Sequence, residues 1–389
     1  TDWSVEKSFV VERTSNSQRN ANAESVEKQR PARAAFSPSS SNLLATLNQR
    51  EAHLWDIEKN THLAEFRTHH SRRLTASWSA DQRLMLTASD AIRVFDADPA
   101  SPNRGQTLLR IPVSSGDSPL AYARFSPVPG DLRFLSGNEA GNVLLYRCTN
   151  TGALEGSPVP FPAAENNPLP EAAAALASLR FPSSARWSGD GKLCALIRNG
   201  ELSCWKTDEQ TPQPIPIKNP EGFPPLRCND LVIAKDGDSL LLAAAGLAWI
   251  DDSDQLLPAA AFWKLNAQNE FVQVGLLLDD KRHFGDQQAL DDVEQDLPPG
   301  ITAIGFDSLS RTIFTGGRDG RVFEWAAGDF TSDQPTREFL GLSKEANAAD
   351  VKRGENLFTR VISLQVAADG RLIAADSTGN ILIWPPVPK

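Results

Sequence analysis

Histidine and carboxylate side chains are the groups in this sequence best suited to acid–base or metal chemistry, and several of them gather in one segment. His283 lies close to Asp279, Asp280 and Asp286, and an imidazole with carboxylates is a ligand set that suits several divalent metal ions. A second acidic group, at residues 251–254, lacks the glycine and distal glutamate of a calcium-binding EF-hand loop. Because acidic loops usually face water, we expect neither group to hold a metal ion.

Sequence motifs of common enzymes are not found. The chain contains no GxSxG, no P-loop, no HExxH and no GxGxxG followed by a helix. We therefore expect a protein that has no catalytic activity and binds no cofactor.

The composition indicates a soluble, acidic chain. Its 389 residues include 39 Lys and Arg against 49 Asp and Glu, which gives a formal net charge of −10. Nucleic-acid-binding faces are usually basic, and anionic membranes attract cations, so neither is an expected partner. No run approaches the roughly 18 apolar residues that a membrane-spanning helix needs. Since the chain begins at Thr1 and has Met85 as its single methionine, we expect a domain of a larger, bacterial-type multidomain protein, with a cytoplasmic location favoured.

An internal repeat organises most of the chain. Each unit reads as a strand, a turn, an apolar strand, a second turn and an alternating strand that ends in an aromatic residue. These aromatic residues recur at intervals of 40 to 62 residues, at Trp55, Phe95, Tyr146, Trp205, Trp263, Trp325 and Trp384. A fourth strand is expected after the aromatic residue, for example at residues 62–68, 106–113, 270–278 and 337–343. Four antiparallel strands in each of seven units predict an all-β fold, a seven-bladed β-propeller.

The units resemble divergent WD40 repeats. Trp55-Asp56 is the dipeptide that names the family, Phe95-Asp96 nearly matches it, and Phe-Ser-Pro recurs at residues 36–38 and 125–127. The blades are expected to begin near residues 33, 74, 120, 184, 229, 301 and 361, within a single propeller domain that spans residues 1–389 and is monomeric.

Ring closure is also expected. The chain ends soon after the third strand of the seventh unit, while residues 3–13 are strand-like and belong to no unit. The resemblance implies that this N-terminal strand completes the last blade, which would remove an open sheet edge. Residues 14–31 are then a polar connector.

His70 and Asp90 have a structural explanation. The resemblance implies that His70 occupies the position of the WD40 histidine ahead of the first strand, and that Asp90 lies in the matching turn, where the two hydrogen-bond. In the family this network continues to a tryptophan, but Phe95 cannot donate a hydrogen bond. We expect structural roles for both residues and for the aromatic residues that end the units, Trp55, Trp205, Trp263, Trp325 and Trp384.

The four cysteines form no CxxC pair. If Asn199-Gly200 is a type I′ turn, Ala195 pairs with Cys204 across the hairpin. Cys194 then points to the opposite face, because side chains alternate along a strand. We therefore expect packed thiols here and not a disulfide.

Long insertions are expected to gather on one face of the propeller. Residues 14–31, 164–183, 279–299 and 344–358 link the fourth strand of one unit to the first strand of the next, and residues 246–259 lie within a hairpin of second and third strands. Antiparallel strand order brings all of these connections to the same face. Segments 171–179 and 343–358 have helical patterns. Segment 279–299 is strongly acidic and should make this face negative.

This insertion-bearing face is the predicted binding surface, because functional residues tend to lie on surface loops of rigid scaffolds. Its centre should be lined by turns between second and third strands, with two arginines of the connection entering blade 2 and the acidic insertion nearby. The candidate partner-binding residues are Arg50, Arg72, Arg73, Glu139, Asn199, Arg318, Asp376, Asp279, Asp280, Asp291, Asp292 and Glu294.

Three functions fit these features. The favoured hypothesis is a non-catalytic scaffold that presents the insertion-bearing face to a protein or peptide. The second is a sensor or regulatory domain that contacts another domain of its own chain. The third, a propeller enzyme that acts on a small molecule at the axis, would need matching metal ligands in several blades, and the sequence shows no such set.

Overall fold

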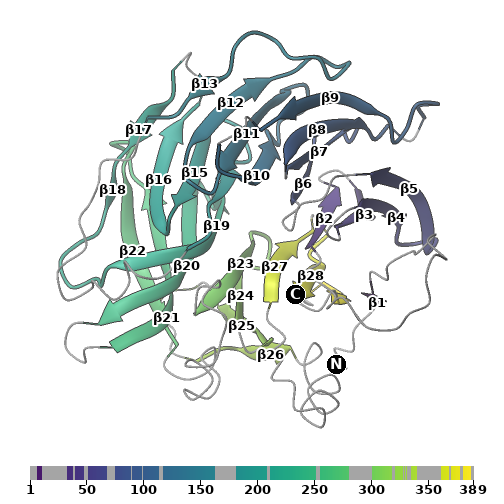
Figure 1. Ribbon diagram of the computed structural model, residues 1–389. Coiled ribbons are helices and arrows are strands. Elements are labelled where there is room, and N and C mark those ends of the chain that lie inside the picture. The colour runs from purple at the N-terminus through teal and green to yellow at the C-terminus, as the bar shows by residue number, and fades with distance from the viewer. Residues whose placement is uncertain are drawn as a thin grey trace, which may run out of the picture.

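β-Strands make up all of the regular secondary structure that the computed structural model describes. The described residues are 7–10, 33–37, 40–47, 51–67, 75–88, 90–98, 100–113, 117–162, 181–207, 211–250, 255–279, 300–317, 320–326, 328, 330, 334–339, 361–367, 369–376 and 380–386. Within these residues, 29 strands form seven sheets, six of four strands and one of five, around a central axis (Figure 1). Each sheet corresponds to one sequence unit and is called a blade.

The first three blades each consist of four consecutive antiparallel strands. Blade 1 contains β2 (Arg33–Ser37), β3 (Ser40–Leu47), β4 (Glu51–Asp56) and β5 (Thr61–Arg67). Blade 2 contains β6 (Thr75–Trp78), β7 (Leu84–Ala88), β8 (Ala91–Asp96) and β9 (Thr107–Pro112). Blade 3 contains β10 (Leu120–Phe125), β11 (Arg133–Asn138), β12 (Val143–Arg147) and β13 (Val159–Pro160).

Blades 4 and 6 repeat this order, and blade 5 has one additional strand. Blade 4 contains β14 (Ser184–Trp187), β15 (Leu193–Arg198), β16 (Glu201–Lys206) and β17 (Gln213–Ile215). Blade 5 contains β19 (Leu226–Asp236), β20 (Ser239–Ile250), β21 (Gln255–Leu265) and β22 (Phe271–Leu278), with β18 (Ile217–Lys218) parallel to β22. Blade 6 contains β23 (Ile301–Asp307), β24 (Thr312–Gly317), β25 (Val322–Ala326) and β26 (Arg337–Phe339).

Blade 7 joins the two ends of the chain. It contains β27 (Val361–Val366), β28 (Leu372–Asp376), β29 (Asn380–Trp384) and the N-terminal strand β1 (Lys7–Val10). β1 pairs antiparallel with β29, with Phe9 opposite Ile381. The predicted closure of the last blade by the N-terminal strand is therefore confirmed.

The hydrophobic core lies between the blades. Seven buried clusters are found among the described residues, and each contains side chains from two neighbouring blades, including one between blades 7 and 1. A middle strand therefore packs against one neighbour on each of its faces, and every residue of β15 and of β24 is buried. This explains why these strands are apolar along their whole length and do not alternate.

The long spacing in the fifth unit arises from long strands. β20 and β21 pair continuously from Leu241 opposite Lys264 to Ile250 opposite Gln255. The long hairpin insert predicted at residues 246–259 is therefore present, and most of it extends the two strands of the hairpin. Only its tip, residues 251–254, lies outside the described residues.

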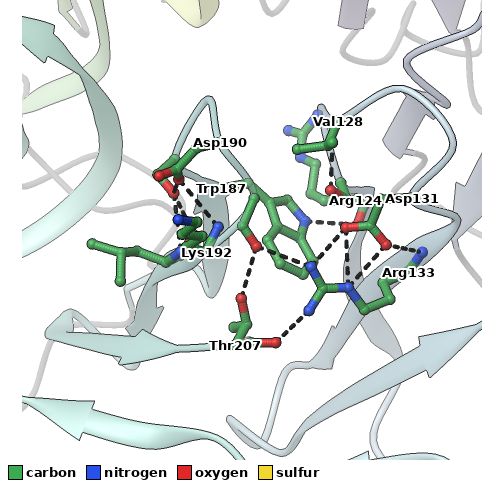
Figure 2. Close-up of polar contacts among 12 residues, drawn as sticks. Arg124, Val128, Asp131, Arg133, Trp187, Asp190, Lys192 and Thr207 are labelled. Atoms are coloured by element: carbon green, nitrogen blue, oxygen red, sulfur yellow. Dashed lines mark hydrogen bonds and ion pairs between the residues drawn. The ribbon is translucent and has the colours of Figure 1, made fainter. Parts of the chain in front are cut away.

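Arginine side chains join neighbouring blades at the turns between first and second strands. In blade 3, Arg133 binds Asp131 through Nε at 2.9 Å and through Nη2 at 2.7 Å (Figure 2). It also donates to the carbonyl oxygens of Gly191, at 3.1 Å, and Thr207 in blade 4, and it lies 5.5 Å from the ring centre of Trp187. In blade 7, Arg371 likewise binds its own turn carboxylate and lies over an aromatic ring of blade 1.

The cysteines are packed thiols in the register that the sequence predicts. Asn199 and Gly200 have φ angles of 50° and 81°, as a type I′ turn requires, and Ala195 lies opposite Cys204. All four cysteines are buried and free. Burial raises the pKa of the thiols of Cys148, Cys204 and Cys228 to about 12, so the unreactive protonated form prevails at neutral pH.

Candidate functional site

The first strands of the seven blades surround a polar channel at the axis of the ring. The channel encloses about 100 Å³ and is lined by residues from every blade. The charged groups of this wall are Arg124, Arg186 and Asp230, and its neutral polar groups include Asn229 and Ser363. A space of this size admits a few water molecules or a side chain of a bound partner.

Most of the channel lining lies toward the face that carries the turns between second and third strands. Its lining residues lie near the beginnings of first strands, as do Ala34 in β2, Thr75 in β6 and Thr302 in β23. Leu47, the last residue of β3, lines it as well. In an antiparallel blade, the beginning of the first strand and the end of the second lie at the same edge. This is the face predicted to be the binding surface.

An ion pair crosses the channel wall between blades 4 and 5. Arg186 Nη2 donates to Asp230 Oδ1 at 2.9 Å, and Arg186 Nη1 donates to the hydroxyl of Ser184 and the carbonyl of Ala185. The second carboxylate oxygen of Asp230 accepts the amide of Ile304 in blade 6 at 3.2 Å. One carboxylate thus connects three blades and holds the Arg186 guanidinium in the wall.

Arg124 connects the other side of the channel. Its Nη1 donates to the carbonyl of Ala76 in blade 2 at 3.1 Å, and its own carbonyl accepts the indole N–H of Trp187 in blade 4 at 3.1 Å (Figure 2). Both channel arginines immediately precede the aromatic residue that ends the first strand, Phe125 or Trp187. Arg124, Arg186 and Asp230 were not among the predicted site residues, although each is visible in the sequence as a charged residue inside an apolar first strand.

Two of the predicted binding residues, Glu139 and Asn199, are exposed at neighbouring turns of this face. The amide of Glu139 donates to the carbonyl of Pro119, just before the first strand of blade 3. A Cβ atom on Gly141 would lie 3.9 Å from the Asn199 side-chain nitrogen, so the turns of blades 3 and 4 adjoin. The structure therefore places these two residues on adjacent turns beside the channel wall.

Two other predicted residues are buried. Asp279 is 1% exposed, and its amide donates to the carbonyl of Pro258 at the edge of blade 5. Asp376 is fully buried at the end of β28, where it pairs with Val361. The expectation that both side chains are exposed on a binding surface is wrong.

The remaining predicted residues lie outside the described residues, and their roles stay predictions. They are Arg50, Arg72, Arg73, Arg318, Asp280, Asp291, Asp292, Glu294 and the structural candidate His70. The same holds for the segments with helical patterns, for His283 and for residues 251–254. In the part of the chain that is described, no three His, Cys, Asp or Glu side chains are grouped so that they could hold a metal ion.

Asp90 binds an arginine of its own blade. Its carboxylate accepts hydrogen bonds from both terminal nitrogens of Arg93, at 3.1 and 3.4 Å. The Arg93 side chain is 2% exposed, and burial, together with the charge of Arg110, lowers its pKa to about 10. Asp90 thus compensates the buried charge of Arg93. This is a structural role, as expected, but its partner is an arginine, whereas a histidine was expected.

The aromatic residues at the ends of the third strands are packed between blades, as expected for structural residues. Trp205, Trp263, Trp325 and Trp384 are at most 3% exposed, and Trp55 is half-buried. In two blades the indole N–H donates to a threonine of the second strand: Trp55 to Thr46 at 2.9 Å and Trp325 to Thr315 at 2.8 Å. Both hydrogen bonds join the third strand of a blade to its second strand.

No family model and no curated protein matches the sequence. In fold, the chain is similar to the β-propeller domain of Cps50 (Swd1) from Myceliophteria thermophila, with a TM-score of 0.60 over 94% of this chain and 99% of that domain. The sequences are 13% identical, so the likeness concerns the fold. It confirms the prediction of an all-β propeller. None of the described segments forms a helix long and apolar enough to cross a membrane.

Proposed function

We propose that this chain is a protein-interaction scaffold, which binds a protein or peptide partner on the face that carries the turns between second and third strands. The observation that carries the proposal is that most of the lining of the axial channel lies toward the same face as the exposed turn residues Glu139 and Asn199. Propellers of the WD40 type commonly bind proteins, and the rigid ring holds surface side chains in fixed relative positions.

The charge pattern supports a polar partner segment. Arg186 is 28% exposed in the channel wall, whereas Asp230 is largely covered by the blades it connects. A partner can therefore reach a positive group at the axis and the negative Glu139 at the rim. A segment that carries both a hydrogen-bond acceptor and a basic side chain fits this arrangement.

Charge reversal on the proposed face provides the test. The domain and its Glu139→Arg variant are used in parallel to capture proteins from a lysate of the source organism, and captured proteins are identified by mass spectrometry. The matched control is Asp238→Arg, because Asp238 is also an exposed acidic turn residue but lies in a turn between first and second strands, on the opposite face.

We expect Glu139→Arg to lose a partner that the wild type and Asp238→Arg both retain, with equal melting temperatures for the three proteins. Equal capture by all three proteins, or loss with Asp238→Arg alone, would contradict the proposal.

A further inference from the structure

Arg198, the last residue of β15, carries a buried guanidinium group with a free edge. The residue is 8% exposed. Its Nη1 donates to the carbonyl of Pro162 at 2.6 Å, and the guanidinium lies 5.6 Å from the ring centre of Trp205. Its Nε and Nη2 atoms are buried and have no hydrogen-bond partner among the described residues. Buried polar groups in proteins are nearly always hydrogen-bonded, and a buried charge needs a partner.

The free edge is the one that other arginines of this chain use to bind a carboxylate. Arg133 holds Asp131 through Nε and Nη2 at 2.9 and 2.7 Å. Arg311 holds Asp236 through the same two atoms at 2.7 and 3.1 Å. This edge presents two parallel N–H groups that match the two oxygens of a carboxylate.

A second unpartnered donor lies in the same surroundings. The hydroxyl of Tyr122 is buried and has no hydrogen-bond partner among the described residues, and Tyr122 interacts electrostatically with Arg198. Burial raises the pKa of Tyr122 and also that of Cys194, the other titratable group near this guanidinium, so both are neutral at pH 7. Neither group therefore balances the charge of Arg198.

Two glycines of blade 3 adjoin these side chains, and Gly137 leaves space that the Tyr122 ring fills. A Cβ atom on Gly137 would lie 2.5 Å from the Tyr122 hydroxyl oxygen, and one on Gly141 would lie 3.5 Å from Arg198 Cβ. Arg198 therefore lies next to the adjoining turns that expose Glu139 and Asn199, between blades 3 and 4.

We propose that the Nε and Nη2 atoms of Arg198, with the Tyr122 hydroxyl, form a binding site for a carboxylate group. A carboxylate is favoured over a phosphate because it is planar, matches the two N–H groups and fits a covered site. The carboxylate of an acidic side chain in a bound peptide and that of a free small acid supply the same chemistry. The inference that the carboxylate belongs to a bound peptide rests on the proposed function, whereas the inference of a carboxylate site does not.

Thermal melting at constant ionic strength tests the site without any partner. Sodium acetate replaces sodium chloride in steps, and sodium phosphate is compared at equal ionic strength. We expect acetate at tenfold excess over its dissociation constant to raise the melting temperature of the wild type by about 2 °C. Arg198→Met should abolish this rise and Tyr122→Phe should reduce it.

The matched control is Arg133→Met, because the same edge of Arg133 is already filled by Asp131. This variant should keep the acetate-dependent rise. An equal rise in Arg198→Met, no rise in the wild type, or a rise with phosphate but not with acetate would overturn the proposal.

Crystals of the wild type soaked in bromoacetate provide a second readout that does not depend on the folding of any variant. An anomalous peak for bromine beside Arg198 supports the site, and its absence at a concentration that saturates the melting effect overturns it. Two short peptides, identical except for a Glu or a Gln at one position, then distinguish a peptide side chain from a free small acid as the source of the carboxylate. If the source is a peptide, the Glu peptide binds at least tenfold more tightly than the Gln peptide. Failure to capture a partner on the proposed face would leave the acetate result unaffected, so the two proposals fail separately.

Discussion

Arg186 and Asp230 form an ion pair at 2.9 Å that joins blade 4 to blade 5 in the wall of the axial channel. The same carboxylate accepts the backbone amide of Ile304 in blade 6. The side chain of Asp230 is 11% exposed, so most of this network is shielded from water. The packing of three blades around the channel therefore depends on one acidic side chain.

Replacement of this carboxylate should weaken the ring. Asp230→Asn leaves Arg186 without its anionic partner, and we expect the free energy of unfolding to fall by about 2 kcal/mol, below the 3–5 kcal/mol typical of a fully buried pair because Arg186 is partly exposed. Denaturant unfolding of Asp230→Asn, Arg186→Met and the double variant measures the coupling. Effects of the single variants that add without a coupling energy would contradict this account.

Acid should destabilise the protein partly through Asp236. Burial alone would raise the pKa of this carboxyl group, but hydrogen bonds from Lys264, at 2.9 Å, and from Arg311, at 2.7 Å, lower it below its ordinary value. A lowered pKa in the folded state contributes stability that is present above the unfolded value, about 4, and is lost as the pH falls further. We expect the melting temperature of the wild type to decline below about pH 4, and that of Asp236→Asn to decline less steeply. Parallel curves for the two proteins between pH 7 and pH 2 would exclude this contribution.

A methyl group should not fit at Gly137. Its carbon would lie 2.3 Å from Tyr122 Cζ, a distance that forces the ring or the strand to move. We expect Gly137→Ala to lower the free energy of unfolding by about 1–3 kcal/mol, as overpacking of a core does. Gly189→Ala is the matched control, since no atom lies within 4 Å of its added carbon. Tyr122→Leu should make the Gly137→Ala substitution less harmful, and equal effects in both backgrounds would argue against the clash.

Removal of the closing strand should open the ring. Deletion of residues 1–10 takes β1 away from β29 and leaves the hydrogen-bonding edge of β29 exposed. We expect a lower melting temperature and concentration-dependent aggregation, measured by light scattering. A synthetic peptide of residues 1–13 added to the truncated protein should restore the melting temperature, whereas a scrambled peptide should not. A truncated protein as stable as the intact one would show that closure by β1 is dispensable.

Local patterns were sufficient to predict the order of the strands. The Asn199-Gly200 turn fixes the register of its hairpin, and the structure has Ala195 opposite Cys204 as expected. The recurring aromatic residues mark the ends of the third strands, which end at Trp384 or one residue after Trp205 and Trp325. These features were predictable because turns and alternation involve residues that are close in sequence.

The candidate site was less predictable. Glu139 and Asn199 were expected at the surface and are exposed, but Asp279 and Asp376 were expected there and are buried. A turn residue and a residue at the end of a strand look alike in sequence, and the neighbouring blade decides which of them is covered. The long hairpin of blade 5 was expected, but its continuous strand pairing was not, since the contacts that cover its apolar residues come from elsewhere in the chain.

The sequence by itself determined the repeat and the four-strand order of each blade, because these follow from periodicity and turn chemistry. The closure of the ring by the N-terminal strand was predicted from the resemblance to WD40 repeats. Only the tertiary structure decided that Arg124, Arg186 and Asp230 meet at the axis, and that the buried Nε and Nη2 atoms of Arg198 have no hydrogen-bond partner among the described residues. Asp230 is 44 residues from Arg186 and 74 from Ile304 along the chain. Such contacts depend on how seven blades pack around one axis, and no local pattern of residues specifies that geometry.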